Sequence, residues 1–322
     1  MTLPSGREVP SVGLGLWKID QDVTAGIVEQ AIACGYRHLD SAADYGNEIQ
    51  TGDGLTASLS KGSVRREDLW ITSKLWNTFH RPEHVRPALE KSLRDLQVDY
   101  LDLYLMHFPI AQKYVPIEKR YPPGWFDDPD ANQPVMIPDQ VPIIETWQAM
   151  EELVGAGLVR EIGVCNFVIA LLRDLMNQAK IKPAMLQVEI HPYLSQQKLL
   201  RFCQDVGIGV TAFSPLGAQS YFELNMAEQD ESLLRNDVIQ RIAQQCDRTP
   251  AQICLRWGIQ RRTSIVPKSS RPERLKENLE LFDFELSQEQ MEQIDALDCH
   301  RRFNDPGVFC ESAFNTFFPI YE

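Results

Sequence analysis

Polar residues end successive apolar segments of this chain at a nearly constant interval. Asp40, Lys74 and His107 each close a short apolar run, with 34 positions from Asp40 to Lys74 and 33 from Lys74 to His107. A strand, a helix and two loops need about 30 residues or slightly more. The spacing therefore predicts consecutive β/α units that each carry a polar group at the same strand end. In a (β/α)8 (TIM) barrel, that end carries the chemistry.

The rest of the chain continues this alternation. Four strand candidates lie before residue 108, and three of them end at the polar residues. Four further candidates, 158–164, 184–188, 208–213 and 264–267, bring the total to eight. Helices are expected at about 22–33, 47–60, 83–96, 143–156, 168–179, 195–206, 235–247 and 272–280. Alternating strands and helices favour a parallel sheet, here a closed one. We expect an α/β chain that forms one barrel domain over residues 1–322.

Three further segments stand apart from the repeating units. A turn signal at Ser5 and Gly6 predicts a small N-terminal β-hairpin that plugs the barrel bottom. The segment 110–140 is long and rich in proline, which is typical of a functional or a disordered loop. The tail 299–322 is rich in Phe and is expected to lie over the barrel mouth. Capping boxes predict helix starts at Thr249, Ser270 and Ser287.

Composition excludes several classes of partner. The net charge of −13 argues against nucleic acid and anionic membranes. Seven cysteines without a CxxC pair indicate reduced thiols and a cytoplasmic protein. The N-terminus lacks the apolar core of a signal peptide, and no run approaches the roughly 20 apolar residues of a membrane span. A monomer or a homodimer is expected.

Four polar groups, Asp40, Tyr45, Lys74 and His107, form the predicted catalytic set. A tyrosine phenol has a pKa of about 10, which is high for proton exchange near neutrality. A lysine ammonium beside the phenol would lower that pKa, and an aspartate would keep the lysine charged. A histidine nearby could hydrogen-bond a carbonyl oxygen. None of the four is an activated nucleophile, so a hydride for reduction of C=O must come from a cofactor.

Longer stretches that contain these residues resemble the signature sequences of the aldo-keto reductases. The matching stretches are GYRHLDSAADYGNE (35–48), Lys74, LDLYLMHFP (101–109), GVCNF (163–167), LQVEIHPY (186–193) and IVPKSS (265–270). They occur in order along nearly the whole chain. SAADYGNE, HFPI, GAQSYFELN and RFNDP are most similar to xylose reductases and plant aldose-6-phosphate reductases.

The resemblance implies a mechanism and an arrangement of loops. Tyr45 would donate the proton, Lys74 and Asp40 would lower its pKa, and His107 would orient the carbonyl. The long loop after the fourth strand and the C-terminal loop would cover the active site. The expected reaction is reduction of the aldehyde of an aldose, xylose or another small sugar aldehyde, to the alditol.

The cofactor site is predicted far from the glycine-rich start of the chain. Gly13 and Gly15 give G-x-G, but Lys18 stands where the Rossmann fingerprint needs a third glycine, so that fold is rejected. The segment 268–276 carries four cations and one acid. The Ser270 capping box would add a helix N-terminus, which attracts phosphate. An ordinary basic helix start is the alternative reading.

The resemblance assigns roles to further cofactor residues. Lys268, Ser269 and Arg274 would bind the 2′-phosphate of NADPH, with Ser270 beside them and Glu277 and Asn278 near the adenine; NADH remains possible. Cys165, Asn166 and Gln187 would bind the carboxamide of the nicotinamide, and Phe213 would stack on its ring. A loop would close over the pyrophosphate with Ser214, Leu216 and the run Gln219 to Glu223, which includes Ser220.

Substrate residues and alternatives complete the sequence-based predictions. The resemblance places Trp17, Asp44, Trp76, Phe108 and Asn304 along the substrate pocket. Lys113, Lys119, Arg120, Arg301 and Arg302 either form a solvated surface or bind a sugar phosphate, as an aldose-6-phosphate reductase would require. A cofactor-binding redox sensor and a purely structural barrel are more distant alternatives. No metal is expected, because the single i, i+4 histidine pair (His80 and His84) has no carboxylate to complete a ligand set.

Overall fold

Eight parallel strands form one sheet in which every strand pairs with the next along the chain. The computed structural model describes residues 1–321. The strands are β1 (Leu14–Gly15), β2 (His38–Asp40), β3 (Trp70–Leu75), β4 (Leu101–Met106), β5 (Val159–Cys165), β6 (Met185–Glu189), β7 (Gly209–Phe213) and β8 (Ser264–Ile265).

The sheet closes between its last strand and the chain just before β1. Gly13 N–H donates to the carbonyl of Ile265 at 2.8 Å, and Ile265 N–H donates to the carbonyl of Ser11 at 2.9 Å. Val12 and Ile265 form a parallel bridge at the same place. The predicted (β/α)8 barrel is therefore confirmed.

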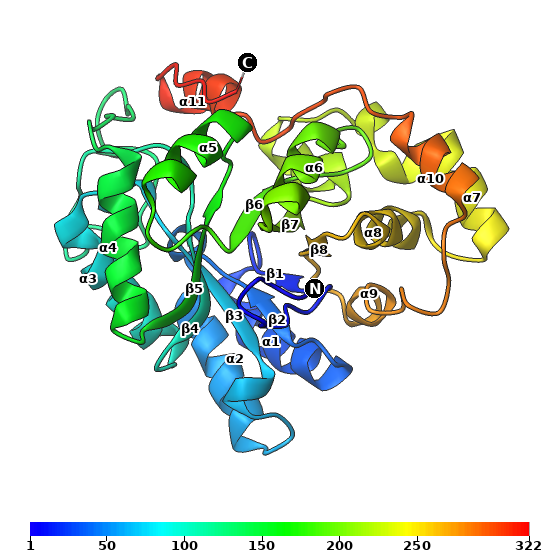
Figure 1. Cartoon of the computed structure of the whole chain (residues 1–322), viewed down its shortest axis with the longest axis horizontal. Coiled ribbons are helices and arrows are strands. Elements are labelled where there is room, and N and C mark those ends of the chain that lie inside the picture. The colour runs from blue at the N-terminus through cyan, green and yellow to red at the C-terminus, as the bar shows by residue number, and fades with distance from the viewer. Residues whose placement is uncertain (322) are drawn as a thin grey trace.

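Helices lie outside the strands (Figure 1). They are α1 (Gln21–Cys34), α2 (Glu48–Ser60), α3 (Pro82–Leu96), α4 (Ile143–Gly155), α5 (Ile169–Gln178), α6 (Gln197–Val206), α7 (Asp237–Cys246), α8 (Pro250–Gln260), α9 (Pro272–Glu277), α10 (Gln288–Asp295) and α11 (Pro306–Phe314). The capping boxes at Thr249 and Ser287 start α8 and α10 as expected. The prediction of a capping box at Ser270 is wrong. Arg271 is the N-cap of α9, without a side-chain cap, because Pro272 occupies the first helical position.

The N-terminal hairpin covers the bottom of the barrel, as predicted. Thr2 and Glu8 form an antiparallel bridge, and Leu3 N–H donates to the carbonyl of Arg7. Leu3 and Val9 are buried against Trp70, Leu103, Leu105, Cys165 and Met185 inside the barrel. Burial of these apolar side chains from both sides seals the end opposite the predicted site.

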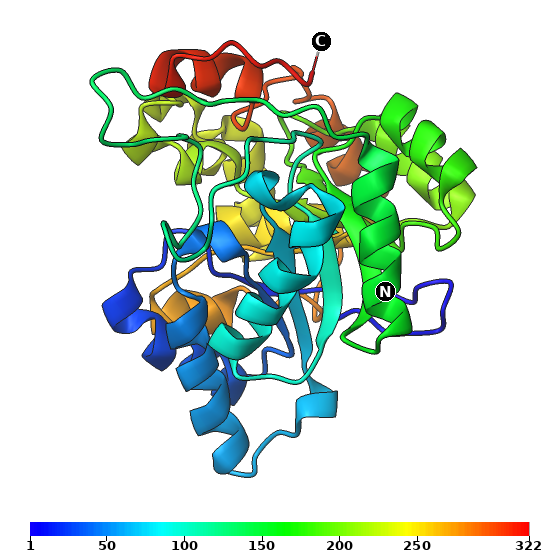
Figure 2. The same cartoon turned by 90° about the vertical axis from the view of Figure 1, so that its left-hand side faces the viewer.

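The long loop after β4 and the C-terminal tail pack on each other over the barrel mouth. Met136 N–H donates to the hydroxyl of Thr316 at 3.1 Å, and the Asn315 side chain donates to the carbonyl of Pro134 at 2.9 Å. Met136 also packs with Phe309 of α11. Figure 2 shows the loop running beside α11 at the top of the molecule. The two segments form one cover.

None of the helices within residues 1–321 is long and apolar enough to cross a membrane. All seven cysteines are free thiols.

Candidate active site

Lys74 lies at the centre of the predicted catalytic set. Its side chain is fully buried on β3 at the mouth of the barrel. Nζ donates to Oδ2 of Asp40 at 2.8 Å, to the carbonyl of Ser41 at 2.8 Å and to the phenol oxygen of Tyr45 at 2.9 Å. Three donors meet three acceptors, so the ammonium is fully satisfied. The strand-end spacing therefore does bring Asp40, Tyr45 and Lys74 into contact.

Burial controls the protonation of this set. For Lys74, burial is the largest influence and opposes the charge, but Asp40, through its charge and its hydrogen bond, acts with Tyr45 and Cys165 to outweigh it and hold the pKa above its usual value. For Tyr45, burial raises the pKa above its ordinary value, and the Lys74 ammonium only partly opposes that rise. The sequence-based expectation of a net lowered phenol pKa is therefore not met in this structure. Tyr45 is a neutral phenol whose conjugate base would face a fixed cation.

His107 follows β4 and stands beside the phenol. Its Nδ1 lies 3.2 Å from Oδ1 of Asp44, and its ring meets Tyr45 edge-on with ring centroids 5.9 Å apart. Trp76 also meets the imidazole edge-on, with ring centroids 5.3 Å apart. Trp76 is buried and does not line the cavity, so it packs against His107, whereas the resemblance implied a pocket wall.

A cavity of about 950 Å³ opens above these groups. The predicted substrate residues Trp17, Asp44, Phe108 and Asn304 line it. The sequence reasoning missed Trp125 from the long loop and Phe309 and Phe314 from the tail, together with Met226 and Leu224, whereas Tyr221 lies in the run Gln219 to Glu223 that was expected to close over the cofactor. Trp125 stands in an irregular loop, and Phe309 and Phe314 stand on α11, a helix that the sequence analysis did not expect.

The residues predicted to hold the nicotinamide amide lie on β5 and β6 or directly after them. Gln187 donates from Nε2 to Oδ1 of Asp40 at 2.7 Å, which leaves its carbonyl oxygen for a ligand. Asn166 donates from Nδ2 to the carbonyl of His107 at 2.9 Å, and its Oδ1 accepts from the phenol of Tyr321 at 3.2 Å. Cys165 and Phe213 line the same part of the cavity.

One end of the cavity is strongly basic. Lys268, Arg271 and Arg274 line it, and none of the three has a carboxylate within 4 Å among residues 1–321. Unpaired cations that share a concave surface suit a phosphate group. Ser269 and Ser270 line the cavity here too, but Ser269 Oγ accepts from the backbone of Arg271 at 3.1 Å. The residue types and their exposure therefore fit the phosphate of a nicotinamide dinucleotide.

Two residues predicted near the adenine lie outside the cavity lining. Glu277 accepts a hydrogen bond from the Thr249 hydroxyl at 2.6 Å, and Asn278 is buried behind it. Arg271, which was not assigned from the sequence, takes a place on the lining. The positive charge of segment 268–276 was the sequence signal that could have assigned Arg271 to the phosphate site.

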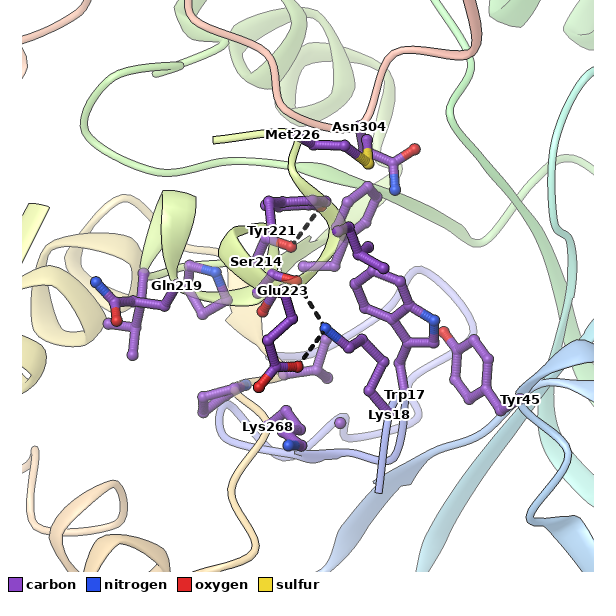
Figure 3. A pocket seen from close by; sticks show the side chains of 18 of the residues that line it. Trp17, Lys18, Tyr45, Ser214, Gln219, Tyr221, Glu223, Met226, Lys268 and Asn304 are labelled. Carbon is purple, nitrogen blue, oxygen red and sulfur yellow. Dashed lines mark hydrogen bonds and ion pairs between the residues drawn. The ribbon is translucent and has the colours of Figure 1, made fainter. Parts of the chain in front are cut away.

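The loop after β7 reaches across the cavity to the loop after β1. Lys18 donates to the carbonyl of Ser220 at 3.2 Å, and its Nζ lies 2.9 Å from Glu223 (Figure 3). Gln219 donates to Ser232 at 2.6 Å, and the hydroxyls of Ser214 and Tyr221 lie 2.9 Å apart. Ser214, Leu216, Gln219 and Ser220 all line the cavity, as expected for a loop that closes over a ligand.

The cations considered for a sugar phosphate are not free in the cavity. Arg301 pairs with Glu231 through Nε at 2.5 Å, and Lys113 pairs with Asp127 at 3.1 Å. The guanidinium of Arg302 lies 3.6 Å from the ring centroid of Tyr321. None of these three, nor Lys119 or Arg120, lines the cavity.

Comparison with known proteins agrees with this geometry. A profile described as "Aldo/keto reductase family" matches residues 11–298. The chain belongs to the aldo/keto reductase family. An NADPH-dependent D-xylose reductase of Meyerozyma guilliermondii is 49% identical over 95% of this chain and 96% of its own length. An NADPH-dependent aldose reductase of Saccharomyces cerevisiae is 46% identical over 98% of both chains.

A solved structure is similar over the full length of this aldo/keto reductase. The aldose reductase of Schistosoma japonicum superposes with a TM-score of 0.87 and 38% identity, covering 100% of this chain and 98% of the other. The family and the barrel fold predicted from the sequence are both confirmed.

Proposed function

We propose that this protein is an NADPH-preferring reductase that converts the aldehyde of a small aldose, such as xylose, to the alditol. The observation that carries the proposal is the buried Asp40–Lys74–Tyr45 hydrogen-bond chain at one end of a cavity whose other end holds three unpaired cations. Relatives 46–49% identical over nearly the whole chain are named as D-xylose and aldose reductases, which supports the substrate class.

The residues of this chain divide the chemistry between them. NADPH supplies the hydride when bound. Tyr45 donates its proton to the carbonyl oxygen, because burial keeps the phenol protonated. The Lys74 ammonium, 2.9 Å from the phenol oxygen, stabilises the phenolate that remains, and Asp40 fixes that ammonium. His107 hydrogen-bonds the carbonyl oxygen and orients it toward Tyr45.

The cavity walls suit a polyhydroxylated chain. Asp44 and Asn304 offer polar atoms: Oδ1 of Asn304 is buried without a hydrogen-bond partner among the described residues, whereas Oδ1 of Asp44 already lies 3.2 Å from Nδ1 of His107. Trp17, Phe108 and Trp125 provide apolar faces against which the C–H groups of a sugar can pack. A buried polar atom without a partner is costly, so the Asn304 oxygen favours a ligand with hydroxyl donors.

The proposal disfavours a sugar phosphate as the substrate. Such a ligand needs a cation near the substrate end, yet Arg301, Arg302 and Lys113 are engaged elsewhere. We further propose a cytoplasmic location, which seven free thiols suit. Whether the enzyme is a monomer or a homodimer stays a prediction.

The test is initial-rate reduction of xylose, erythrose, glyceraldehyde, glucose 6-phosphate and mannose 6-phosphate with NADPH and with NADH. We expect higher kcat/KM for the free sugars and for NADPH. In Tyr45→Phe, turnover should fall by at least about 100-fold, because loss of a general acid costs about 10²–10⁴. NADPH binding, read from tryptophan fluorescence, should persist. Preference for the phosphosugars, or full activity in Tyr45→Phe, would refute the proposal.

A further inference from the structure

Glu189 is a fully buried carboxylate at the end of β6 that takes no part in the proposed proton transfer. Oε1 accepts the backbone N–H of Phe303 at 2.9 Å, and Oε2 accepts that of Asn304 at 2.9 Å. The imidazole Nε2 of His191 lies 2.9 Å from Oε1. The carboxylate therefore ties a barrel strand to a tail segment more than 110 positions away.

The hydrogen bonds to Glu189 fix the position of the tail backbone at residues 303 and 304. Burial of an unpaired carboxylate costs several kcal/mol, whereas hydrogen bonds to a charged acceptor are short and strong. The two oxygens of Glu189 accept the consecutive backbone amides of Phe303 and Asn304, so the carboxylate holds this segment at two adjacent points. The end of the barrel strand thus fixes the position of the tail backbone beside the cavity.

One of the two anchored residues, Asn304, lines the cavity (Figure 3). Phe303 stacks on Tyr221 with ring centroids 5.5 Å apart and an interplanar angle of 16°, and Tyr221 in turn lies 6.0 Å from Trp17. The bonds to Glu189 therefore hold the tail against two other walls of the same cavity.

We propose that Glu189, supported by His191, is a positioning residue that fixes the 303–304 segment so that the Asn304 carboxamide meets a hydroxyl group of the sugar. The inference rests on the proposed function for its substrate. It assigns sugar selectivity in part to a residue that never touches the sugar. The aldehyde chemistry at Tyr45 does not depend on it.

The test compares Glu189→Gln with a matched variant. In Glu189→Gln, the new amide N–H₂ faces one backbone N–H and leaves it without an acceptor. We expect kcat/KM for xylose to fall by roughly tenfold through a higher KM, the effect of about one charge-assisted hydrogen bond. The kcat/KM for pentanal should change by less than about twofold, because pentanal has no hydroxyl group that Asn304 could bind.

Glu151→Gln is the control. Glu151 is also buried and accepts two backbone amides, from Lys180 at 2.7 Å and Ile181 at 2.9 Å, but it does not line or touch the cavity. It should lose stability without changing the ratio of xylose to pentanal activity. If it shifts this ratio as Glu189→Gln does, the effect is general destabilisation and the inference fails.

A double-mutant cycle with Asn304→Ala identifies the route of the effect. If Glu189 acts through Asn304, the double variant should reduce xylose no worse than Asn304→Ala alone. Additive losses would overturn the inference, and so would equal losses with xylose and pentanal.

Amide hydrogen exchange of the wild-type protein keeps the anchor testable if Glu189→Gln does not fold. The amides of Phe303 and Asn304 should exchange more slowly than that of neighbouring Arg302. Equal exchange would overturn the anchor. If the wild-type enzyme reduces pentanal but not xylose, the proposed sugar substrate fails, and the exchange experiment still decides whether Glu189 holds the tail.

Discussion

The phenol of Tyr321 donates a hydrogen bond to Oδ1 of Asn166 at 3.2 Å. Burial raises the pKa of Tyr321, so the phenol is a neutral donor. Nδ2 of Asn166 already donates to the carbonyl of His107 at 2.9 Å. Both polar atoms of a residue predicted to bind the nicotinamide amide are therefore engaged by the protein itself, and the C-terminal tail competes for one of them.

This competition predicts tighter cofactor binding when the phenol is removed. In Tyr321→Phe, Oδ1 of Asn166 is free to accept from a ligand amide. We expect the Kd for NADPH to fall by about 2- to 10-fold, the equivalent of one neutral hydrogen bond. Titration of tryptophan fluorescence measures it. Tyr100→Phe, which lies between Arg66 and Arg160 far from the cavity lining, is the control. Unchanged or weaker binding in Tyr321→Phe would contradict the idea.

The basic end of the cavity predicts how the enzyme distinguishes its two cofactors. Arg274 lines the cavity without an ion-pair partner, whereas Lys276, two residues along the same helix, lies 3.7 Å from Glu280 and outside the lining. We expect Arg274→Ala to raise the KM for NADPH by about 10- to 100-fold, since hydrogen bonds to charged groups are worth about 1.5–3 kcal/mol. The KM for NADH should change little.

Lys276→Ala tests whether charge alone explains the effect. It removes the same charge from the same helix, so it should leave both KM values nearly unchanged. If the two variants weaken NADPH binding equally, the preference for NADPH over NADH comes from the overall positive charge of this segment and not from a contact made by Arg274.

The strand-end residues were predictable from the sequence because a closed parallel sheet brings every strand's carboxyl end to one mouth. Asp40, Lys74 and His107 needed only the β/α spacing. Ser270 was misread because the S-x-x-E pattern ignores Pro272, which takes the first helical position and moves the N-cap one residue later, to Arg271. The start of α11 did carry a signal, since Asp305 accepts from Gly307 N–H at 2.8 Å and Pro306 takes the first helical position.

Other parts of the site depend on contacts that no local pattern encodes. Trp125 and Phe314 stand in a loop and a tail without hydrophobic periodicity, and they meet with ring centroids 5.6 Å apart. The burial of Tyr45, which raises its pKa, likewise follows from packing in the folded barrel and from no local sequence pattern. The residue types of the catalytic set were readable from the sequence, but their protonation was not.

A close helix contact predicts opposite effects for two glycine substitutions. A Cβ on Gly52 of α2 would lie 2.2 Å from the carbonyl oxygen of Asp95 in α3, whereas a Cβ on Gly26 of α1 would meet no atom within 4 Å. Gly52→Ala should therefore lower the free energy of unfolding by about 1–3 kcal/mol through overpacking. Gly26→Ala should raise it by about 0.5–1 kcal/mol, because alanine has less conformational freedom to lose. Urea denaturation of both variants measures the difference, and a stabilised Gly52→Ala would contradict this contact.

His80 gives the stability of the protein a dependence on pH. The side chain is buried, its Nε2 has no partner among the described residues, and burial lowers its pKa to about 3. The pKa of a histidine in the unfolded chain is about 6.5. The contribution of neutral His80 to the free energy of unfolding is therefore fully present above about pH 6.5 and is lost as the pH falls toward the pKa of the folded state. Between pH 7 and pH 5 this contribution should fall by about 2 kcal/mol.

The comparison of His80→Gln with the wild type isolates this contribution, because the other titrating groups are common to both proteins. The loss of unfolding free energy between pH 7 and pH 5 should be about 2 kcal/mol smaller in His80→Gln. His300→Gln is the control, since that side chain is 90% exposed and should leave the pH dependence as it is. If His80→Gln and the wild type lose the same stability over this range, the imidazole gains a proton without unfolding, and its burial must be incomplete in solution.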